Sequence, residues 1–251
     1  MATTFWAWVV SALVIVLLAV VVPRLLGAQH VLRDARGRYS LSRLQVLLWT
    51  VVLLSLVSGM AYGRFAAGQV DVAGFALPGQ VLTLLSIVIG SAVAAAAIKV
   101  VKSTVRPDCV AAHPAGRGRG RFMEMLTVEE GVSAGRSIDL SKFQNFLVTV
   151  LLLLAYTAQA VAALRAVDNP AGIGGLPAFS DTLLVLLAVS HAGYLLGKIP
   201  SPVGTPPDGT MAERLAETAV VEPVVVEPAV AEPVVEPSTN GSVAVPEMWP
   251  A

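Results

Sequence analysis

Long apolar runs with almost no charge alternate with short polar segments along this chain. Each run is close to 20 residues long, and the five runs are Phe5–Val22, Leu44–Tyr62, Leu77–Ile98, Phe143–Leu164 and Leu176–Gly197. A helix of about 20 residues crosses about 30 Å, the thickness of bilayer hydrocarbon. Backbone groups in lipid must be hydrogen-bonded within their own segment, and the runs lack the alternation of barrel strands. The pattern therefore predicts an all-α integral membrane protein with five transmembrane helices.

Basic residues gather in every second connecting segment. Residues 23–43 carry five of them and residues 99–142 carry eight, whereas the two other loops carry one each. Met1–Trp8 has no charge, so the first run is typical of an uncleaved anchor and not of a signal peptide. With Lys198 and Arg214, 15 of the 17 basic residues fall on one side of a five-span arrangement. Because basic loops face the cytoplasm, we predict that the N-terminus is outside and the C-terminus is cytoplasmic.

The composition agrees with a membrane protein. The chain is 55% hydrophobic and 14% charged, whereas soluble domains carry about 25% charged residues. The richness in Ala, Val, Gly and Arg is typical of bacterial genomes high in GC, so we predict a bacterial cytoplasmic (inner) membrane. The net charge is zero, but residues 1–202 net +7 and residues 203–251 net −7. The single cysteine, Cys109, excludes a disulfide within the chain.

The apolar body contains an internal duplication. When the chain is shifted by 99 residues, residues 39–54 align with 138–153 and residues 77–99 align with 176–198, both without gaps. Identical polar and proline pairs include Ser42 with Ser141, Gln45 with Gln144, Thr50 with Thr149, Pro78 with Pro177, Thr83 with Thr182 and Lys99 with Lys198. Both copies begin on the basic side, so they are predicted to be parallel two-helix repeats about an axis along the membrane normal. The first apolar run stands outside the duplication as an anchor helix.

This reading divides the chain into five parts. An anchor helix with a basic cytoplasmic loop (1–38) precedes the first helix-hairpin repeat (39–102). A basic cytoplasmic loop (103–137) connects it to the second repeat (138–198), and a disordered acidic tail (199–251) follows.

Each repeat opens with the pattern L-S-[RK]-x-Q. The six residues predicted at the membrane entry are Ser42, Arg43, Gln45, Ser141, Lys142 and Gln144. Each serine is predicted to be a helix N-cap, and the glutamine three residues later completes a capping box. The two basic residues are predicted to lie at the level of anionic lipid headgroups. Alternatively, the two glutamines line the mouth of a pore.

Small residues recur on two of the predicted helices. Ser86, Gly90 and Ala94 follow one another at a spacing of four, and Gly193 and Gly197 repeat that spacing. Small residues at this spacing let helices approach closely. We predict that these residues serve helix packing within the bundle, with a homo-oligomer through the same faces as the alternative.

His191 is the one histidine inside a predicted span, next to Ser190. Ionisable groups inside a membrane are candidates for function. No acidic partner lies inside any run, apart from Asp181 near the outer end of the last run, and the repeat counterpart of His191 is Ala92. The two readings are a neutral, hydrogen-bonded packing histidine and a speculative polar site on an ion or proton path.

The C-terminal tail is rich in proline, valine and glutamate. Glu-Pro pairs recur at Glu222, Glu227, Glu232 and Glu236. Proline at this spacing excludes a helix and favours an extended chain. The tail is predicted to be a disordered acidic spacer or a docking segment for a basic cytoplasmic protein.

No motif for catalysis, metal binding or nucleotide binding occurs in the sequence. We therefore expect no enzyme activity and no cofactor. The run GRGRGR at 116–121 fits contact with anionic lipid headgroups, so no nucleic-acid partner is expected.

The L-S-[RK]-x-Q helix starts, the following W-T or V-T, and a returning helix that ends in G-K resemble a group of uncharacterised bacterial multi-pass membrane proteins. The resemblance covers about residues 39–198, and Val148 departs from it where that group tends to have Trp. It implies a fold and no activity. The smooth, uncharged cores favour a structural or adapter protein that presents a cytoplasmic loop and acidic tail to partners. The alternative is an oligomeric channel or small transporter.

Overall fold

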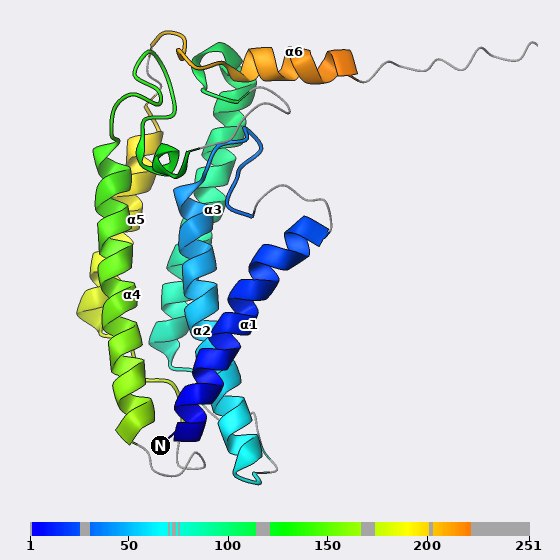
Figure 1. The fold of residues 1–251 in the computed structure, drawn as a ribbon. Coiled ribbons are helices and arrows are strands. Elements are labelled where there is room, and N and C mark those ends of the chain that lie inside the picture. The colour runs from blue at the N-terminus through cyan, green and yellow to red at the C-terminus, as the bar shows by residue number, and fades with distance from the viewer. Residues whose placement is uncertain are drawn as a thin grey trace, which may run out of the picture.

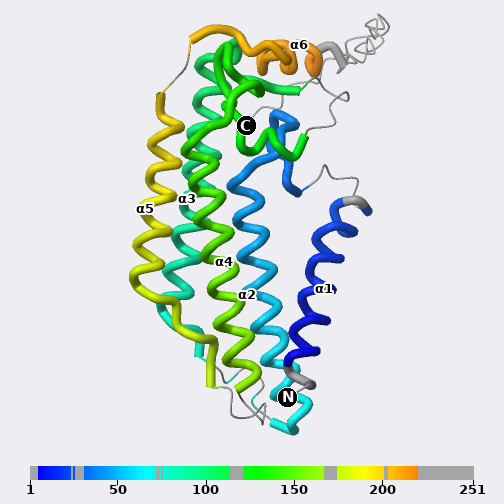
Figure 2. Tube along the Cα trace, turned by 60° about the vertical axis from the view of Figure 1, so that its left-hand side comes forward, coloured from blue at the N-terminus to red at the C-terminus, as the bar shows by residue number. Residues whose placement is uncertain are grey.

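The computed structural model describes residues 2–25, 31–69, 71, 74, 76–113, 121–166, 174–200 and 203–221. Within these residues the protein is all-helical and has no β-strand. The helices are α1 (Ala2–Leu25), α2 (Leu41–Ala66), α3 (Gly79–Val105), η1 (Pro107–Cys109), η2 (Phe122–Leu126), α4 (Leu140–Ala166), α5 (Asp181–Lys198) and α6 (Met211–Val221). Figures 1 and 2 show α1 to α5 side by side and α6 lying across one end of the bundle.

Four of the described helices are long and apolar enough to cross a membrane: Phe5–Pro23 within α1, and the whole of α2, α3 and α4. The shorter α5 has 18 residues, and these include Asp181, His191 and Lys198. The prediction of an all-helical protein with several membrane-length helices is confirmed. A fifth crossing and the duplication stay predictions.

The bundle is apolar on its outside as well as its inside, which distinguishes it from a soluble helical bundle. Its centre holds an aromatic group in which the rings of Trp49, Tyr156 and Phe179 lie 5.4 to 6.2 Å apart. Outward-facing side chains such as Val93 and Leu154 are each 64% exposed. An apolar outer surface of this kind is what a bilayer solvates.

The anchor helix α1 packs mainly along α2. The indole of Trp8 donates a hydrogen bond to the Ser55 hydroxyl (3.0 Å). At Gly59 the two helices come so close that a Cβ would lie 2.8 Å from the Trp8 Cα. A glycine is therefore needed at this contact.

The ends of α3 and α5 and the starts of α2 and α4 lie at one end of the bundle, where a compact irregular structure covers them (Figure 1). We call it the cap, and it consists of residues 31–40, 106–113, 121–139 and 203–221. Isolated bridges join its segments, among them Val110 with Glu130 and Ala111 with Thr210. At the opposite end of the bundle, Ala76 and Gly175 form a parallel bridge between residues 99 positions apart.

The structure corrects the predicted start of the tail. Residues 203–221 are part of the cap, and they contain α6. The Met211 amide donates to the Val110 carbonyl (2.9 Å), and the Arg214 guanidinium donates to the His113 carbonyl (2.6 Å). The Glu-Pro pairs begin only at Glu222, and that part of the tail lies outside the described residues.

The helix starts also differ from the predicted caps. The N-cap residue of α2 is Ser40, two positions before the predicted Ser42. In α4 the carboxylate of Asp139 accepts a hydrogen bond from the Lys142 amide (3.2 Å), so Ser141 lies inside the helix. Both helices begin before the apolar run, at Leu41 and Leu140, so Ser42 and Ser141 lie inside the first turn and are not caps. Ser40 and Asp139 are themselves 99 positions apart.

Candidate functional site

A buried carboxylate, Glu129, lies where the cap meets the bundle. Glu129 is 8% exposed. The Lys142 ammonium donates to Glu129 Oε1 at 2.6 Å, and the ammonium groups of Lys198 and Lys99 lie 3.4 and 3.5 Å from the same oxygen. The Arg36 guanidinium donates to Glu129 Oε2. One side chain thus contacts four cations.

The four cations come from four different elements. Arg36 belongs to the cap segment 31–40, Lys99 lies near the end of α3, Lys142 lies in the first turn of α4, and Lys198 ends α5. Contact with Glu129 therefore ties three helices and a loop to one point of the cap.

A second carboxylate, Asp34, completes the group. It pairs with Arg36 at 3.0 Å and with Lys99 at 3.4 Å. We call the six side chains the ionic cluster: Asp34, Arg36, Lys99, Glu129, Lys142 and Lys198. All six side chains are 12% exposed or less. Two carboxylates face four cations, so the cluster carries an excess of two positive charges when all are ionised.

The cations of the cluster favour the ionised form of its two carboxylates, because they lower the pKa of each one. Burial raises the pKa of Glu129, but Lys142, Lys198, Lys99 and Arg36 outweigh burial and hold that pKa well below its ordinary value. Burial likewise opposes ionisation of Asp34, and Arg36 and Lys99 lower its pKa overall. Both carboxylates are therefore ionised at neutral pH.

A second polar group lies inside the bundle. We call it the polar layer, and it consists of Gln45, Ser91, Asn145, Thr149, Ser190 and His191. The Gln45 amide donates to the Thr149 hydroxyl (2.7 Å), and the Ser190 hydroxyl donates to Asn145 Oδ1 (3.1 Å). His191 Nδ1 lies 2.5 Å from the Ser91 hydroxyl. Among the described residues, neither His191 Nε2 nor Asn145 Nδ2 has a hydrogen-bond partner.

The residues predicted at the membrane entry differ in burial and in their hydrogen-bond partners. The Ser42 hydroxyl lies 2.9 Å from the Tyr194 hydroxyl, and exposed Arg43 donates to the carbonyl of Arg33. Gln144 is exposed, whereas its repeat counterpart in α2 is buried in the polar layer. The two glutamines therefore do not form a pair in this chain.

Lys142 is a correction to the sequence analysis. It was expected at the level of lipid headgroups, but it is 2% exposed and is bound by Glu129 and the Thr127 carbonyl. The cap covers the start of α4 and supplies a carboxylate there, so the ammonium has a protein partner instead of lipid.

Of the small residues predicted for packing, Gly197 makes a close contact within the chain. A Cβ there would lie 2.9 Å from the Ser141 hydroxyl of α4. Ser86, Gly90 and Gly193 are exposed, and Ala94 is half-buried. A Cβ at Gly90 or Gly193 would meet no atom within 4 Å, so neither glycine marks a close helix contact in this structure. A role of these residues in helix packing or in a homo-oligomer stays a prediction.

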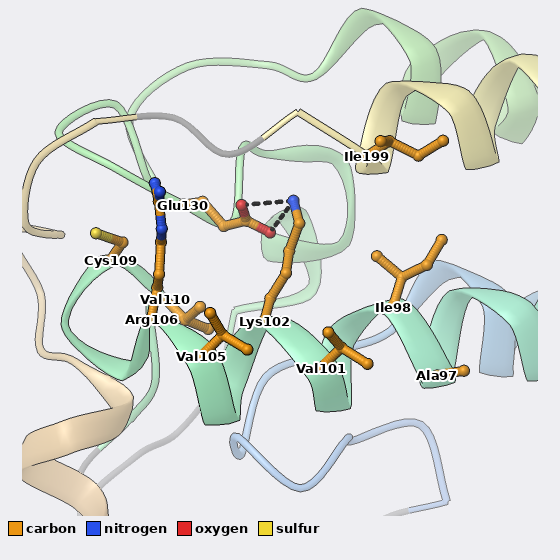
Figure 3. Close-up of a pocket in the computed structure, with 10 residues that line it drawn as sticks. All are labelled: Ala97, Ile98, Val101, Lys102, Val105, Arg106, Cys109, Val110, Glu130 and Ile199. Atoms are coloured by element: carbon orange, nitrogen blue, oxygen red, sulfur yellow. Dashed lines mark hydrogen bonds and ion pairs between the residues drawn. The ribbon is translucent and has the colours of Figure 1, made fainter.

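Two hollows adjoin the cap. One, of about 460 Å³, lies between the end of α3 and the start of the segment after α5, and there Lys102 and Glu130 face one another at 2.8 Å (Figure 3). Aliphatic Ile98, Val101 and Ile199 line its other side. The second hollow, of about 600 Å³, lies between α2 and α3 and reaches Lys99 of the ionic cluster.

Comparisons with known proteins found no matching family model, curated relative or solved structure. Within the described residues, no three His, Cys, Asp or Glu side chains gather as they would around a metal ion. The site must therefore be interpreted from its own geometry.

Sequence reasoning missed Glu129 and Asp34. The basic residues of the cluster were recognised only as a sign of membrane orientation. One signal was present: Glu129 and Glu130 are an acidic pair inside a strongly basic loop. Such a pair is a natural partner for lysines at the ends of apolar runs.

Proposed function

We propose that this protein is a multi-pass scaffold of a bacterial cytoplasmic membrane that presents a fixed platform, the cap, to cytoplasmic partners. In this proposal the chain crosses the membrane five times, with α5 as the last span and the N-terminus outside. The body consists of an anchor and two parallel repeats, which places every strongly basic segment on the cytoplasmic side. The bridge between Ala76 and Gly175, 99 positions apart, supports the repeat.

The observation that carries the proposal is the contact of Glu129 with cations from α3, α4, α5 and the segment 31–40. A loop held only by its two ends would move relative to the bundle. A buried carboxylate bound at four points instead fixes the cap on the helix ends, because breaking a buried ion pair is costly. A fixed surface is what an adapter needs in order to bind a partner without ordering itself first.

The cap also exposes apolar side chains, and because they do not belong to the membrane-length helices, contact with the bilayer does not account for them. Phe122 and Met123 of η2 are 51% and 54% exposed, and Val132 of a nearby turn is 63% exposed. Exposed apolar groups surrounded by polar ones are typical of protein contact sites. These residues, together with the acidic tail, are the proposed contacts for partners.

The adapter proposal is tested by purifying the full chain from its native membrane and identifying the proteins that accompany it. Two variants are compared with the unchanged chain: Phe122→Ser with Met123→Ser, and deletion of residues 222–251. The second variant leaves α6 and the cap intact. We expect a stoichiometric partner to accompany the unchanged chain and to be lost from one of these two variants. The control Val105→Ser, which changes an exposed side chain at the end of α3, should retain that partner. Unchanged partners in both variants would contradict the proposal.

The polar layer favours a second candidate, an oligomeric channel or small transporter. Polar side chains on α2, α3, α4 and α5 that hydrogen-bond across the bundle can serve a polar path as well as packing. The test is ion and proton flux in liposomes that contain the purified protein. Flux that disappears in His191→Ala and Asn145→Leu would support the channel and count against the scaffold.

A further inference from the structure

We propose that the hollow between α2 and α3 binds an anionic membrane lipid, with the headgroup phosphate beside Lys99 and an acyl chain along α3. We call this hollow the groove. It goes beyond the scaffold role, because it concerns the bilayer and not a protein partner.

The shape of the groove suits an amphiphile. Its wall on α3 is formed by Ile89, the adjacent pair Ala92 and Val93, and Ala96, so the wall recurs every three or four residues along one side of the helix. The small alanines leave the space of about 600 Å³ between α3 and α2. Ile89 and Val93 are 48% and 64% exposed, so the groove opens sideways where α3 faces lipid.

The polar end of the groove lies under the cap. Hydroxyl and charged side chains line it there, and the charged ones are the carboxylate of Asp34 and the cations Arg36, Arg43 and Lys99. Met211 and Leu215 of α6 cover this end. Apolar and polar linings thus occupy opposite ends, in the order of an acyl chain and its headgroup.

The charge at the polar end favours an anion. Lys99 belongs to the ionic cluster, in which two carboxylates face four cations. Its ammonium is 3.4 and 3.5 Å from the nearest carboxylate oxygens, longer than the 2.7–2.9 Å that is typical of charge-assisted hydrogen bonds. An ammonium has three donors, and Arg43 adds a further cation at the rim. A phosphate in the groove would offset the excess positive charge, which is costly when it is buried.

The neighbouring hollow beside Cys109 has a smaller imbalance, because one carboxylate, Glu130, faces Lys102 and Arg106 there. There the Lys102 ammonium is bound by both oxygens of Glu130, at 2.8 and 3.0 Å, and by the Pro200 carbonyl at 2.7 Å (Figure 3). It therefore serves as an internal comparison, because it adjoins the same helix and has a similar apolar lining.

Native mass spectrometry of the full chain, purified in detergent and stripped of lipid, tests the proposal. Phosphatidylglycerol and phosphatidylcholine with identical acyl chains are titrated separately, and inorganic phosphate is titrated as a third probe. We expect phosphatidylglycerol to bind at one site at least about tenfold more tightly than phosphatidylcholine, and phosphate alone not to compete at equal concentration. Equal affinity for the two lipids, or full competition by phosphate, would overturn the assignment to an anionic lipid.

Matched variants locate the site. Ala96 lines the groove and Ala97 lines the neighbouring hollow, and both are exposed on α3. Ala96→Leu is expected to weaken phosphatidylglycerol binding by about tenfold because it fills the groove, whereas Ala97→Leu leaves binding unchanged. The reverse order would place the lipid in the other hollow and overturn the proposal.

Two variants that each remove one exposed charge test the headgroup contact without disturbing the fold. Arg43→Gln, an exposed change at the rim, is expected to weaken binding by about fivefold, and Arg106→Gln is expected to have no effect. Thermal unfolding without lipid shows that both variants are folded. Equal binding by Arg43→Gln and the unchanged chain, with a normal unfolding temperature, would contradict a phosphate at this position.

Discussion

Replacing Glu129 by glutamine should loosen the cap more than any other change of one side chain in it. Glutamine keeps the size of the side chain but replaces one acceptor oxygen with an NH2 donor, so the variant removes the charge and one acceptor without leaving a cavity. The four cations around it would then face Asp34 alone. Like charges in a buried cluster repel one another, and the cluster can relieve the repulsion by opening to water.

The magnitude follows from the distances. A pair of unit charges 2.6 Å apart, as Glu129 and Lys142 are, attract by about 6 kcal/mol at an effective dielectric constant of about 20. Desolvation offsets much of that gross attraction, and removing one partner of a buried ion pair costs about 3–5 kcal/mol. We expect a loss of that size in the free energy of unfolding, a large part of the total stability of a typical domain.

Chemical unfolding of the full chain in mild detergent, followed by tryptophan fluorescence, gives the measurement. Glu130→Gln is the matched control, because Glu130 is the next residue and pairs with Lys102 alone. That pair is partly buried, with side chains 12% and 15% exposed, but it joins one carboxylate to one cation and not to four, so its loss should cost less than the loss of Glu129. A Glu129→Gln variant no less stable than Glu130→Gln would refute the reasoning, because the four contacts would then have no energetic weight.

Three further outcomes are expected. The pKa of Glu129 in the folded protein lies well below its ordinary value of 4.5, so its stabilising effect is present above pH 4.5 and is lost as the pH falls further. The free energy of unfolding should therefore drop on acidification, and it should drop less steeply in Glu129→Gln. Parallel pH profiles of the two proteins would contradict this. Gly197→Leu should lower the free energy of unfolding by about 1–3 kcal/mol, because a Cβ at Gly197 already meets Ser141. The control Gly193→Leu places its side chain in open space, so its melting temperature should equal that of the unchanged chain. Asn145→Leu should cost about 1–3 kcal/mol, since it leaves the Ser190 hydroxyl without its acceptor in a buried setting; an unchanged melting temperature would show that the polar layer is not needed for packing.

The helices of the bundle could be predicted because their cause is local. An apolar run near 20 residues has one stable backbone arrangement in lipid. The helices α1, α2 and α4 each contain one predicted run, and α3 contains all but the first two residues of its run. The helix starts could not be fixed to the residue. The α2 and α4 helices begin at Leu41 and Leu140, before the apolar runs, and their serines fall inside the first turn.

The candidate site depends on contacts that local sequence does not encode. Glu129 is 93 residues from Arg36 and 69 residues from Lys198. A loop carboxylate becomes the centre of a cluster only when three helix ends meet beneath it. The same limit applies to Gln45 and Gln144, which share one motif but differ in burial because neighbouring helices cover them differently.

The central claim, that the ionic cluster fixes the cap on the bundle, is tested most directly by hydrogen exchange of the full chain in lipid nanodiscs. The amides to follow are those of Ala111 and Gly131, which donate to the carbonyls of Glu129 and Cys109 within the cap. We expect these amides to exchange as slowly as those near the end of α3, and to exchange much faster in Glu129→Gln while the opposite end of the bundle is unchanged. Fast exchange of these amides in the unchanged chain would contradict a fixed cap.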